Sequence, residues 1–181
     1  VGDWNDDGTI EVIYVGNNNK IKTVTAGGTA DKLPGNAKAS SIAGVGPFGG
    51  SATPAIIFVN SKDSEIKCAE PSSGNSIDIT TTGVTVGSSN AIGPPADYDD
   101  DSELEVPIED GNGNIELVDR DGQDGTVDPN IGVAQAPMGK LQVAGDATPE
   151  IVFVDSNNNF IQYVNPDNGE TESFDVKADT S

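Results

Sequence analysis

The chain has 181 residues, of which 34% are hydrophobic, and this length is enough for one or two domains with a buried core. Nine Lys and Arg residues stand against thirty Asp and Glu residues, so the formal net charge is −21 at pH 7. Because no basic stripe is available to neutralise phosphates, this composition argues against nucleic acid and against an anionic membrane surface as partners.

The strong negative charge also bears on the solvent in which the protein works. At low ionic strength so many carboxylates repel one another, whereas about 1 M salt shortens the screening length to about 3 Å. The composition therefore resembles that of proteins from halophilic organisms such as salt-loving archaea. The alternatives are a very soluble acidic surface, or a charge inflated by carboxylates that bind metal.

Two absences limit the chemistry of the chain. Cys68 is the only cysteine, so an intrachain disulfide is impossible, and strand alternation places it beside Ile66 as a core residue. Histidine is absent, which removes the usual general base and the Ser/His and Cys/His nucleophile arrangements. Because histidine is missing, we expect no catalysis. No run approaches the roughly 20 apolar residues of a membrane-spanning helix, so we also expect no membrane insertion.

The chain opens with an oxygen-rich loop that leads directly into an apolar strand. Ca²⁺ takes roughly six to eight oxygen ligands, and a loop with oxygen side chains at alternate positions supplies several of them. Gly8 suits the sharp turn of such a loop because glycine tolerates positive φ. The candidate ligands in this first loop are Asp3, Asn5, Asp7, Glu11 and the backbone carbonyl of Thr9.

A second loop further along the chain repeats this layout at the same offsets. Ser102 occupies the position of Gly8 and fits the turn less well, so we expect this loop to be slightly distorted. The candidate ligands are Asp97, Asp99, Asp101, Glu105 and the backbone carbonyl of Glu103.

Apolar strands recur along the whole chain with a regular spacing. They begin at Glu11, Ala55, Glu105 and Glu150, at intervals of 44, 50 and 45 residues. Each is followed by a polar turn and a second strand, which predicts β-hairpins. The second strands cover residues 20–25, 65–69, 114–119 and 160–165. No segment has apolar residues at helical spacing, so we expect little helix.

A period of about 45 residues with four short strands is typical of a β-propeller blade. The sequence thus predicts an all-β fold, a single β-propeller domain over residues 1–181 with four-stranded blades at about 1–38, 39–83, 84–132 and 133–181. The first blade lacks the strand that precedes the loop in the other copies. Residues 176–181 could supply that strand and close a four-bladed ring; otherwise the blades belong to a larger wheel, completed by further sequence or by a second chain.

The pattern Asp3-x-Asn5-x-Asp7-Gly8-x-x-Glu11, with its counterpart at Asp97, resembles the loop of the FG-GAP/VCBS repeats of integrin-α-like propellers. The resemblance implies Ca²⁺ between the first two strands of a blade, on an extracellular or cell-surface protein used for adhesion, glycan binding or substrate presentation. It implies about two Ca²⁺ sites, one in each loop described above. The corresponding loops at 47–54 and 145–150 keep too few carboxylates and should be empty.

Other motifs have ordinary interpretations beside functional ones. The acidic stretch 119–125 is favoured as a turn over a further cation site, because its spacing fits no full ligand set. Trp4, Phe48 and Tyr98 sit near the second position of their loops, where packing between blades is favoured over stacking on sugars. Arg120, the only arginine, cannot form the arginine cluster of sialidase-type propellers.

These observations lead to one preferred function and two alternatives. The preferred function is a secreted or cell-surface, calcium-binding β-propeller that acts as a non-catalytic binding or adhesion module for a glycan or protein ligand. The first alternative is a structural subunit of an extracellular surface assembly, in which self-association lets neighbouring chains complete one wheel. The second is a Ca²⁺-dependent polysaccharide lyase or glycosidase, which would need only a pair of carboxylates.

Overall fold

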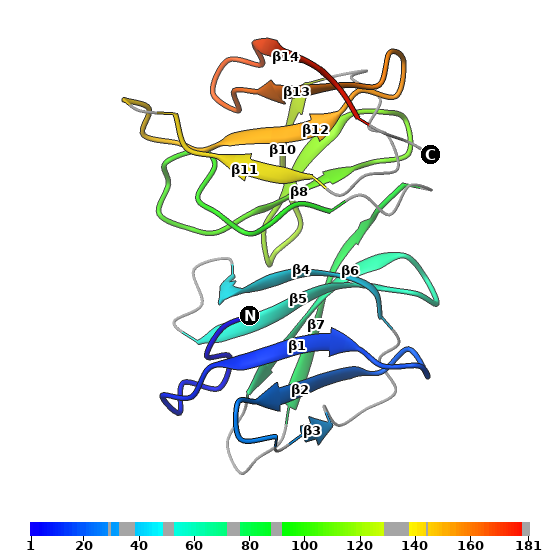
Figure 1. Cartoon of the computed structure of the whole chain (residues 1–181), viewed down its shortest axis with the longest axis vertical. Coiled ribbons are helices and arrows are strands. Elements are labelled where there is room, and N and C mark those ends of the chain that lie inside the picture. Colours follow the sequence, from blue (N-terminus) through cyan, green and yellow to red (C-terminus); the bar gives the residue numbers. More distant parts are fainter. Residues whose placement is uncertain are drawn as a thin grey trace.

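The protein is all-β. The computed structural model describes residues 1–28, 30–32, 39–48, 53–71, 77–87, 92–128, 138–143 and 145–178. These residues form fourteen strands in four antiparallel sheets, and no helix occurs among them (Figure 1). The expected β-rich, repeated architecture is thereby confirmed.

Each sheet is built from consecutive strands of the chain. The first sheet contains β1 (Glu11–Val15), β2 (Ile21–Thr25) and β3 (Ala30–Lys32). The second contains β4 (Ala39–Pro47), β5 (Pro54–Asn60), β6 (Glu65–Pro71) and β7 (Ile77–Thr85). The third contains β8 (Val106–Glu109), β9 (Ile115–Val118) and β10 (Gln123–Asp128). The fourth contains β11 (Gly139–Leu141), β12 (Glu150–Val154), β13 (Phe160–Val164) and β14 (Thr171–Lys177).

The four predicted hairpins are present, as β1–β2, β5–β6, β8–β9 and β12–β13. Their turns use residues that accept left-handed geometry. Asn19 has φ 57° and Asn159 has φ 61°, a region that Asn enters more readily than most residues. The polar turns between apolar strands therefore set the register of each hairpin.

In the described residues of the first and third sheets, the strand that would precede β1 or β8 is represented only by isolated bridges. Ala96 bridges Glu105 in the third sheet, and Gly2 bridges Glu11 in the same way in the first. Within the described residues, the C-terminal segment does not fill the gap in the first sheet, contrary to one of our two expectations. Lys177 pairs with Phe160 in the fourth sheet instead. Residues 179–181 lie outside the described part of the chain.

The sheets pack face to face in chain order, and three buried clusters hold them together. Trp4 lies between the first and second sheets, Phe48 between the second and third, and Tyr98 between the third and fourth. All three side chains are buried, which confirms packing over sugar stacking. Cys68 and Ile66 share the second of these interfaces, as alternation predicted.

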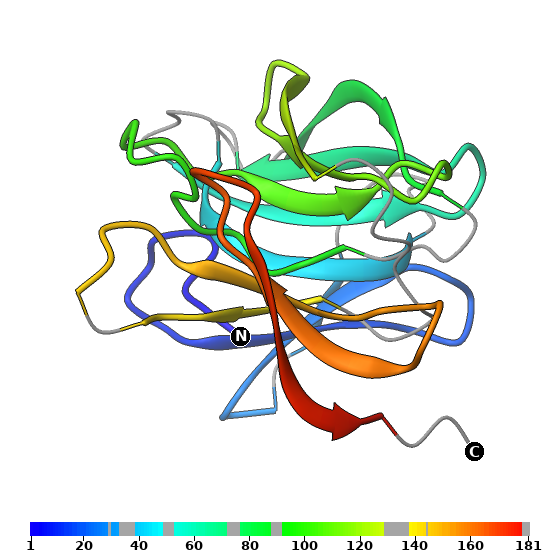
Figure 2. The same cartoon turned by 90° about the horizontal axis from the view of Figure 1, so that it is seen from above.

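In the described part of the chain, the second and third sheets are covered on both faces, whereas the first and fourth are each covered on one face only. No apolar cluster among the described residues joins the first sheet to the fourth, so these sheets do not close into a ring. Seen from above, the first and fourth sheets lie on the side of the molecule away from the second and third (Figure 2). The described residues contain no helix long and apolar enough to cross a membrane.

Candidate metal centre

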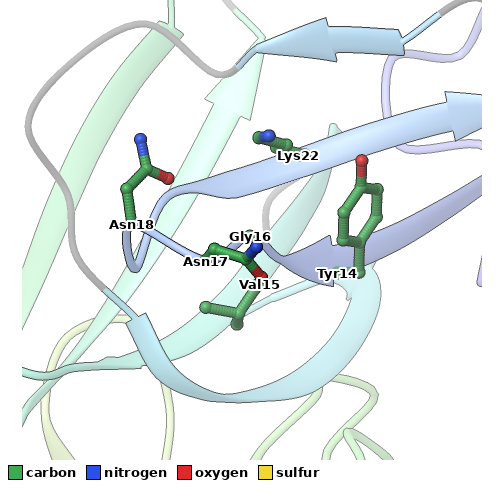
Figure 3. Close-up of a pocket in the computed structure, with 6 residues that line it drawn as sticks. All are labelled: Tyr14, Val15, Gly16, Asn17, Asn18 and Lys22. Carbon is green, nitrogen blue, oxygen red and sulfur yellow. The ribbon is translucent and has the colours of Figure 1, made fainter.

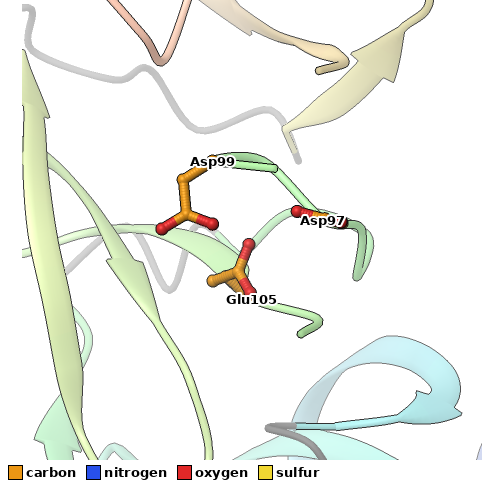
Figure 4. A group of neighbouring side chains, drawn as sticks. All are labelled: Asp97, Asp99 and Glu105. Carbon is orange, nitrogen blue, oxygen red and sulfur yellow. The ribbon is translucent and has the colours of Figure 1, made fainter. Parts of the chain in front are cut away.

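The second acidic loop brings three carboxylates together. Oxygen atoms of Asp97, Asp99 and Glu105 all lie within 4.8 Å of one another, and their side chains converge from the loop and from the start of the following strand (Figure 4). Two oxygens on opposite sides of a Ca²⁺ ion are roughly 4.6–5.2 Å apart, since each Ca–O bond is about 2.3–2.6 Å. The spacing of this group therefore suits a cation at its centre.

Two oxygens of this group are buried without a partner. Asp97 Oδ1 and Glu105 Oε1 have almost no exposed surface and accept no hydrogen bond from the described residues. Buried polar atoms in proteins are nearly always paired, and leaving one unpaired costs roughly 1–3 kcal/mol. The remaining oxygens do have donors: Glu105 Oε2 accepts the amide of Tyr98 at 2.8 Å, and Asp97 Oδ2 accepts that of Ser102 at 3.1 Å. The loop thus satisfies one oxygen of Asp97 and one of Glu105 and leaves the other oxygen of each buried without a hydrogen bond.

The charge distribution points to the same need for a cation. Burial, together with the neighbouring carboxylates of Asp99, Asp101 and Asp97, raises the pKa of Glu105 to about 8, although the hydrogen bond from the Tyr98 amide acts in the opposite direction. The group therefore resists carrying its full negative charge, as expected for acids that lack a compensating positive charge.

The first loop has the same backbone architecture. The amide of Trp4 donates to Glu11 Oε2 at 3.4 Å, and the amide of Gly8 donates to Asp3 Oδ2 at 2.8 Å. The amide of Thr9 donates to Asp7 Oδ1 at 2.8 Å, as that of Glu103 does to Asp101 Oδ1 at 2.7 Å. Two segments 94 residues apart thus fold alike because they place the same acceptors at the same offsets.

The acids of the first loop are nevertheless more dispersed. Both oxygens of Asp3 accept backbone amides, from Asp7 at 3.0 Å and from Gly8, while Asn5 donates to the Asp7 carboxylate at 3.0 Å. Hydrogen bonds with Thr9 lower the pKa of Asp7, which is exposed. Within the described residues, only the second loop gathers three acids closely enough to hold an ion.

The distortion expected at Ser102 is not seen in the backbone. Ser102 has φ 75°, close to the 83° of Gly8, and the residues two positions earlier, Asp100 and Asp6, are also left-handed at 63° and 54°. The loop amides that bind the Asp97 and Asp101 carboxylates hold Ser102 in this conformation. The loop keeps its shape and carries the strain of a serine at positive φ.

The other predicted ligands are not among the three acids that converge. Asp101 lies on the exposed outer side of the loop and is not among the three converging acids. Asn5 accepts the amide of Asp7 at 3.3 Å, as Asp99 accepts that of Asp101 at 3.3 Å. The backbone carbonyls of Thr9 and Glu103 remain predicted ligands.

The fourth loop contains one feature that the sequence did not reveal. Glu150 is 3% exposed, and its Oε2 atom is buried without a hydrogen bond, while Oε1 accepts the side chain of Asn165 at 3.2 Å. Burial raises the pKa of Glu150, and Asp146 and Asp167 add to this. Its place in the repeat, the same as that of Glu11 and Glu105, was the available signal. The loop at 47–54, also predicted to be empty, lies partly outside the described residues.

The acidic stretch beginning at Asp119 forms a turn, which is the interpretation favoured from its sequence. Asp119 Oδ1 accepts the amides of Asp121 at 2.8 Å and Gly122 at 2.7 Å. Arg120 reaches back to Glu70 through two hydrogen bonds of 2.7 and 2.8 Å. These residues link the second and third sheets rather than forming a site.

Comparison with known proteins adds no identification, since no family model matches this chain and no curated protein matches it.

Proposed function

We propose that the chain is a Ca²⁺-stabilised β-propeller module at the cell surface, one that binds a glycan or protein ligand rather than catalysing a reaction. The observation that carries the proposal is the pair of buried, unpaired oxygens, Asp97 Oδ1 and Glu105 Oε1, converging with Asp99. The order in which the sheets pack, each on its neighbour along the chain, supports the propeller assignment.

The donor set favours a hard cation. All three converging groups are carboxylates, and nitrogen and sulfur ligands, which Zn²⁺ and Cu²⁺ favour, are absent from this group. Mg²⁺ requires near-ideal octahedral geometry and retains several waters, whereas Ca²⁺ accepts irregular clusters of carboxylate and carbonyl oxygens. Asp97, Asp99 and Glu105 would hold the ion, with Asp101 and the Glu103 carbonyl as further predicted ligands.

A bound cation would supply structural rather than chemical help. It would neutralise carboxylates that repel one another and fix the loop that carries Tyr98. Because the Tyr98 ring packs between the third and fourth sheets, a firm loop also secures that interface. The absence of histidine, and the resemblance of the loop to FG-GAP/VCBS repeats, support binding over catalysis and a location outside the cell.

Terbium luminescence tests the metal assignment. Tb³⁺ is a hard cation that takes the oxygen ligands of Ca²⁺, and nearby aromatic rings sensitise its emission. Trp4, the only tryptophan, reports on the first loop, and Tyr98 reports on the second. We expect saturable emission under tyrosine excitation that Ca²⁺ displaces and equal Mg²⁺ does not.

Substitutions assign the signal to a loop. Glu105→Gln should abolish the emission sensitised by Tyr98, whereas Glu116→Gln, on β9 and outside the group, should leave it unchanged. Emission that persists in Glu105→Gln would place the ion elsewhere. If Trp4 excitation gives emission that Asp7→Ala abolishes, the first loop is a second metal site. If Trp4 excitation gives no emission, the protein has one metal site, in the loop at 97–105. A glycan and protein binding screen on the loaded protein then tests the choice of ligand class.

A further inference from the structure

The large apolar side chains that remain exposed in the described structure are confined to its two ends. They belong to the first and fourth sheets and the segment that enters β1, namely Val1, Ile10, Val12, Tyr14, Phe174 and Val176. Among the side chains that the structure describes, the second and third sheets contribute none. The unpaired face of the first sheet and that of the fourth are therefore the surfaces that the packing leaves uncovered.

The uncovered face of the first sheet is defined by its register. Val12 pairs with Val24 and Tyr14 pairs with Lys22, so these four side chains share one face. Ile13 and Val15 point to the other face, where they contact the second sheet. Tyr14 and Lys22 stand side by side above the strands, beside a shallow depression of about 430 Å³ bounded by the 16–18 turn (Figure 3). We call Val12, Tyr14, Lys22 and Val24 the first face.

The uncovered face of the fourth sheet follows in the same way. Val152 pairs with Tyr163, and Tyr163 pairs with Glu172, opposite the face of Ile151 that packs on the third sheet. The rings of Tyr163 and Phe174 lie 5.3 Å apart, and Phe174 is 43% exposed. We call Val152, Tyr163, Glu172 and Phe174 the fourth face.

The two faces carry opposite charges, Lys22 on β2 and Glu172 on β14. On the first face, Lys22 lies beside Tyr14 and forms no ion pair with the described residues. On the fourth face, Glu172 accepts the hydroxyl of Tyr163 at 2.6 Å and has no cation partner within the same residues. Each face thus combines aromatic and aliphatic groups with one charge that the other face would balance.

We propose that the first face of one copy of this chain packs on the fourth face of a second copy, and that the second copy returns the same contact. The three interfaces inside the chain show that a sheet of this repeat covers its neighbour face to face, and the proposed contact repeats that mode once more. The first and fourth sheets lie on the same side of the molecule, away from the second and third, so one partner can reach both (Figure 2). The eight sheets would then form one closed ring, within the usual range of about four to eight blades. This inference goes beyond the proposed metal function and does not depend on it.

Sedimentation of the full chain in about 1 M NaCl, where repulsion between copies is screened, provides the test. We expect a reversible species of twice 18.5 kDa, with or without Ca²⁺. Tyr14→Glu and Phe174→Glu should each weaken the dimer by more than about tenfold, because each buries an unpaired charge in both contacts. Lys62→Glu, on the exposed β5–β6 turn, is the matched control and should not change the dimer. Circular dichroism checks that each variant is folded.

Mixing the two variants makes the test specific to unlike faces. A mixture of Tyr14→Glu and Phe174→Glu chains retains one contact with both faces intact, so a heterodimer should reappear where each variant alone is a monomer. A wild-type monomer at all concentrations would overturn the proposal. So would a dimer that Tyr14→Glu breaks and Phe174→Glu does not, since that would indicate pairing of like faces.

Discussion

The backbone amide of Tyr98 donates a hydrogen bond of 2.8 Å to Glu105 Oε2, and so joins the second position of the acidic loop to the start of the strand region that follows it. The side chains of the two residues serve different interactions. The Tyr98 ring enters the core between the third and fourth sheets, whereas Glu105 faces the aspartates of the loop. A change at the ionic group can therefore alter the packing of two sheets.

Glu105→Gln should have opposite effects with and without Ca²⁺. In chelated protein it replaces a buried acid whose charged form is disfavoured by burial and by the neighbouring carboxylates, and we expect the melting temperature to rise by roughly 2–4 °C, or about 1 kcal/mol. In wild-type protein with Ca²⁺ at a hundredfold excess over its dissociation constant, linkage contributes about 2.7 kcal/mol per site, or roughly 5–10 °C. The variant should lose that response. A Ca²⁺-dependent rise of equal size in both proteins would contradict the assignment.

Ser102→Gly should stabilise the protein. Glycine adopts φ 75° without steric cost, so the variant should gain up to about 1 kcal/mol of unfolding free energy, reduced by the greater freedom of glycine in the unfolded chain. Gly8→Ala is the reverse change in the first loop, at φ 83°, and should cost about 1 kcal/mol. Urea denaturation of both variants checks the pair. Two changes of the same sign would show that φ does not govern stability here.

Arg120→Lys should weaken the contact between the second and third sheets. The guanidinium binds both oxygens of Glu70, which is 8% exposed, and an ammonium group cannot form that paired contact. We expect a loss of roughly 1–2 kcal/mol on denaturant unfolding. Lys67→Arg, in an ion pair with Asp63, a more exposed acid than Glu70, should change stability by less than about 0.5 kcal/mol. Equal losses in the two variants would remove any special role for Arg120.

Glu150→Gln should alter the pH dependence of stability. Because burial raises the pKa of Glu150 above its ordinary value of 4.5, the folded state holds a proton that the unfolded state releases. This contribution is fully present below about pH 4.5 and is lost as the pH rises through the folded pKa. The variant should therefore be more stable than wild type at pH 7 and differ less at pH 4.5. Urea unfolding across this range, with Glu170→Gln as an exposed control, provides the measurement, and a constant difference would refute the effect.

Added salt should continue to raise the stability of the protein at NaCl concentrations above those at which an ordinary acidic domain stops responding. With a net charge of −21, repulsion among carboxylates opposes the compact state until counterions screen it. We expect the melting temperature to rise steadily from 0.1 M to above 1 M NaCl, and less steeply when Ca²⁺ is present. A melting temperature that is flat across this series would exclude adaptation to high salt.

The local features of the fold could be predicted because they depend on neighbouring residues. Alternating apolar residues set the faces of each strand, and the Asn-rich turns set the hairpins, so β1–β2 and β12–β13 appeared where expected. The aromatic residues of the loops were correctly assigned to the packing between sheets. The equal spacing of the acids indicated that two distant loops share one layout, and the structure gives both loops corresponding hydrogen bonds to their carboxylates.

The features that could not be predicted depend on which distant segments meet. The C-terminal strand β14 pairs with β13, its neighbour across a short turn, because closing a short loop costs less entropy than joining the two ends of the chain. The pairing of Arg120 with Glu70 spans 50 residues and leaves no local pattern. The two acidic loops looked equivalent in sequence, yet only in the second do three acids converge, a difference of side-chain direction rather than spacing.

Phe48 shows that the aromatic side chain of the repeat occurs without the acidic loop. Its loop, 47–54, has no carboxylate, yet the ring fills the space between the second and third sheets as Trp4 and Tyr98 fill the other two. The aromatic side chain that separates two sheets is therefore present in the repeat with or without an acidic loop beside it. The stacking of this unit on its neighbours does not require the acids, so a copy of the loop can change in composition while the spacing of the sheets is kept.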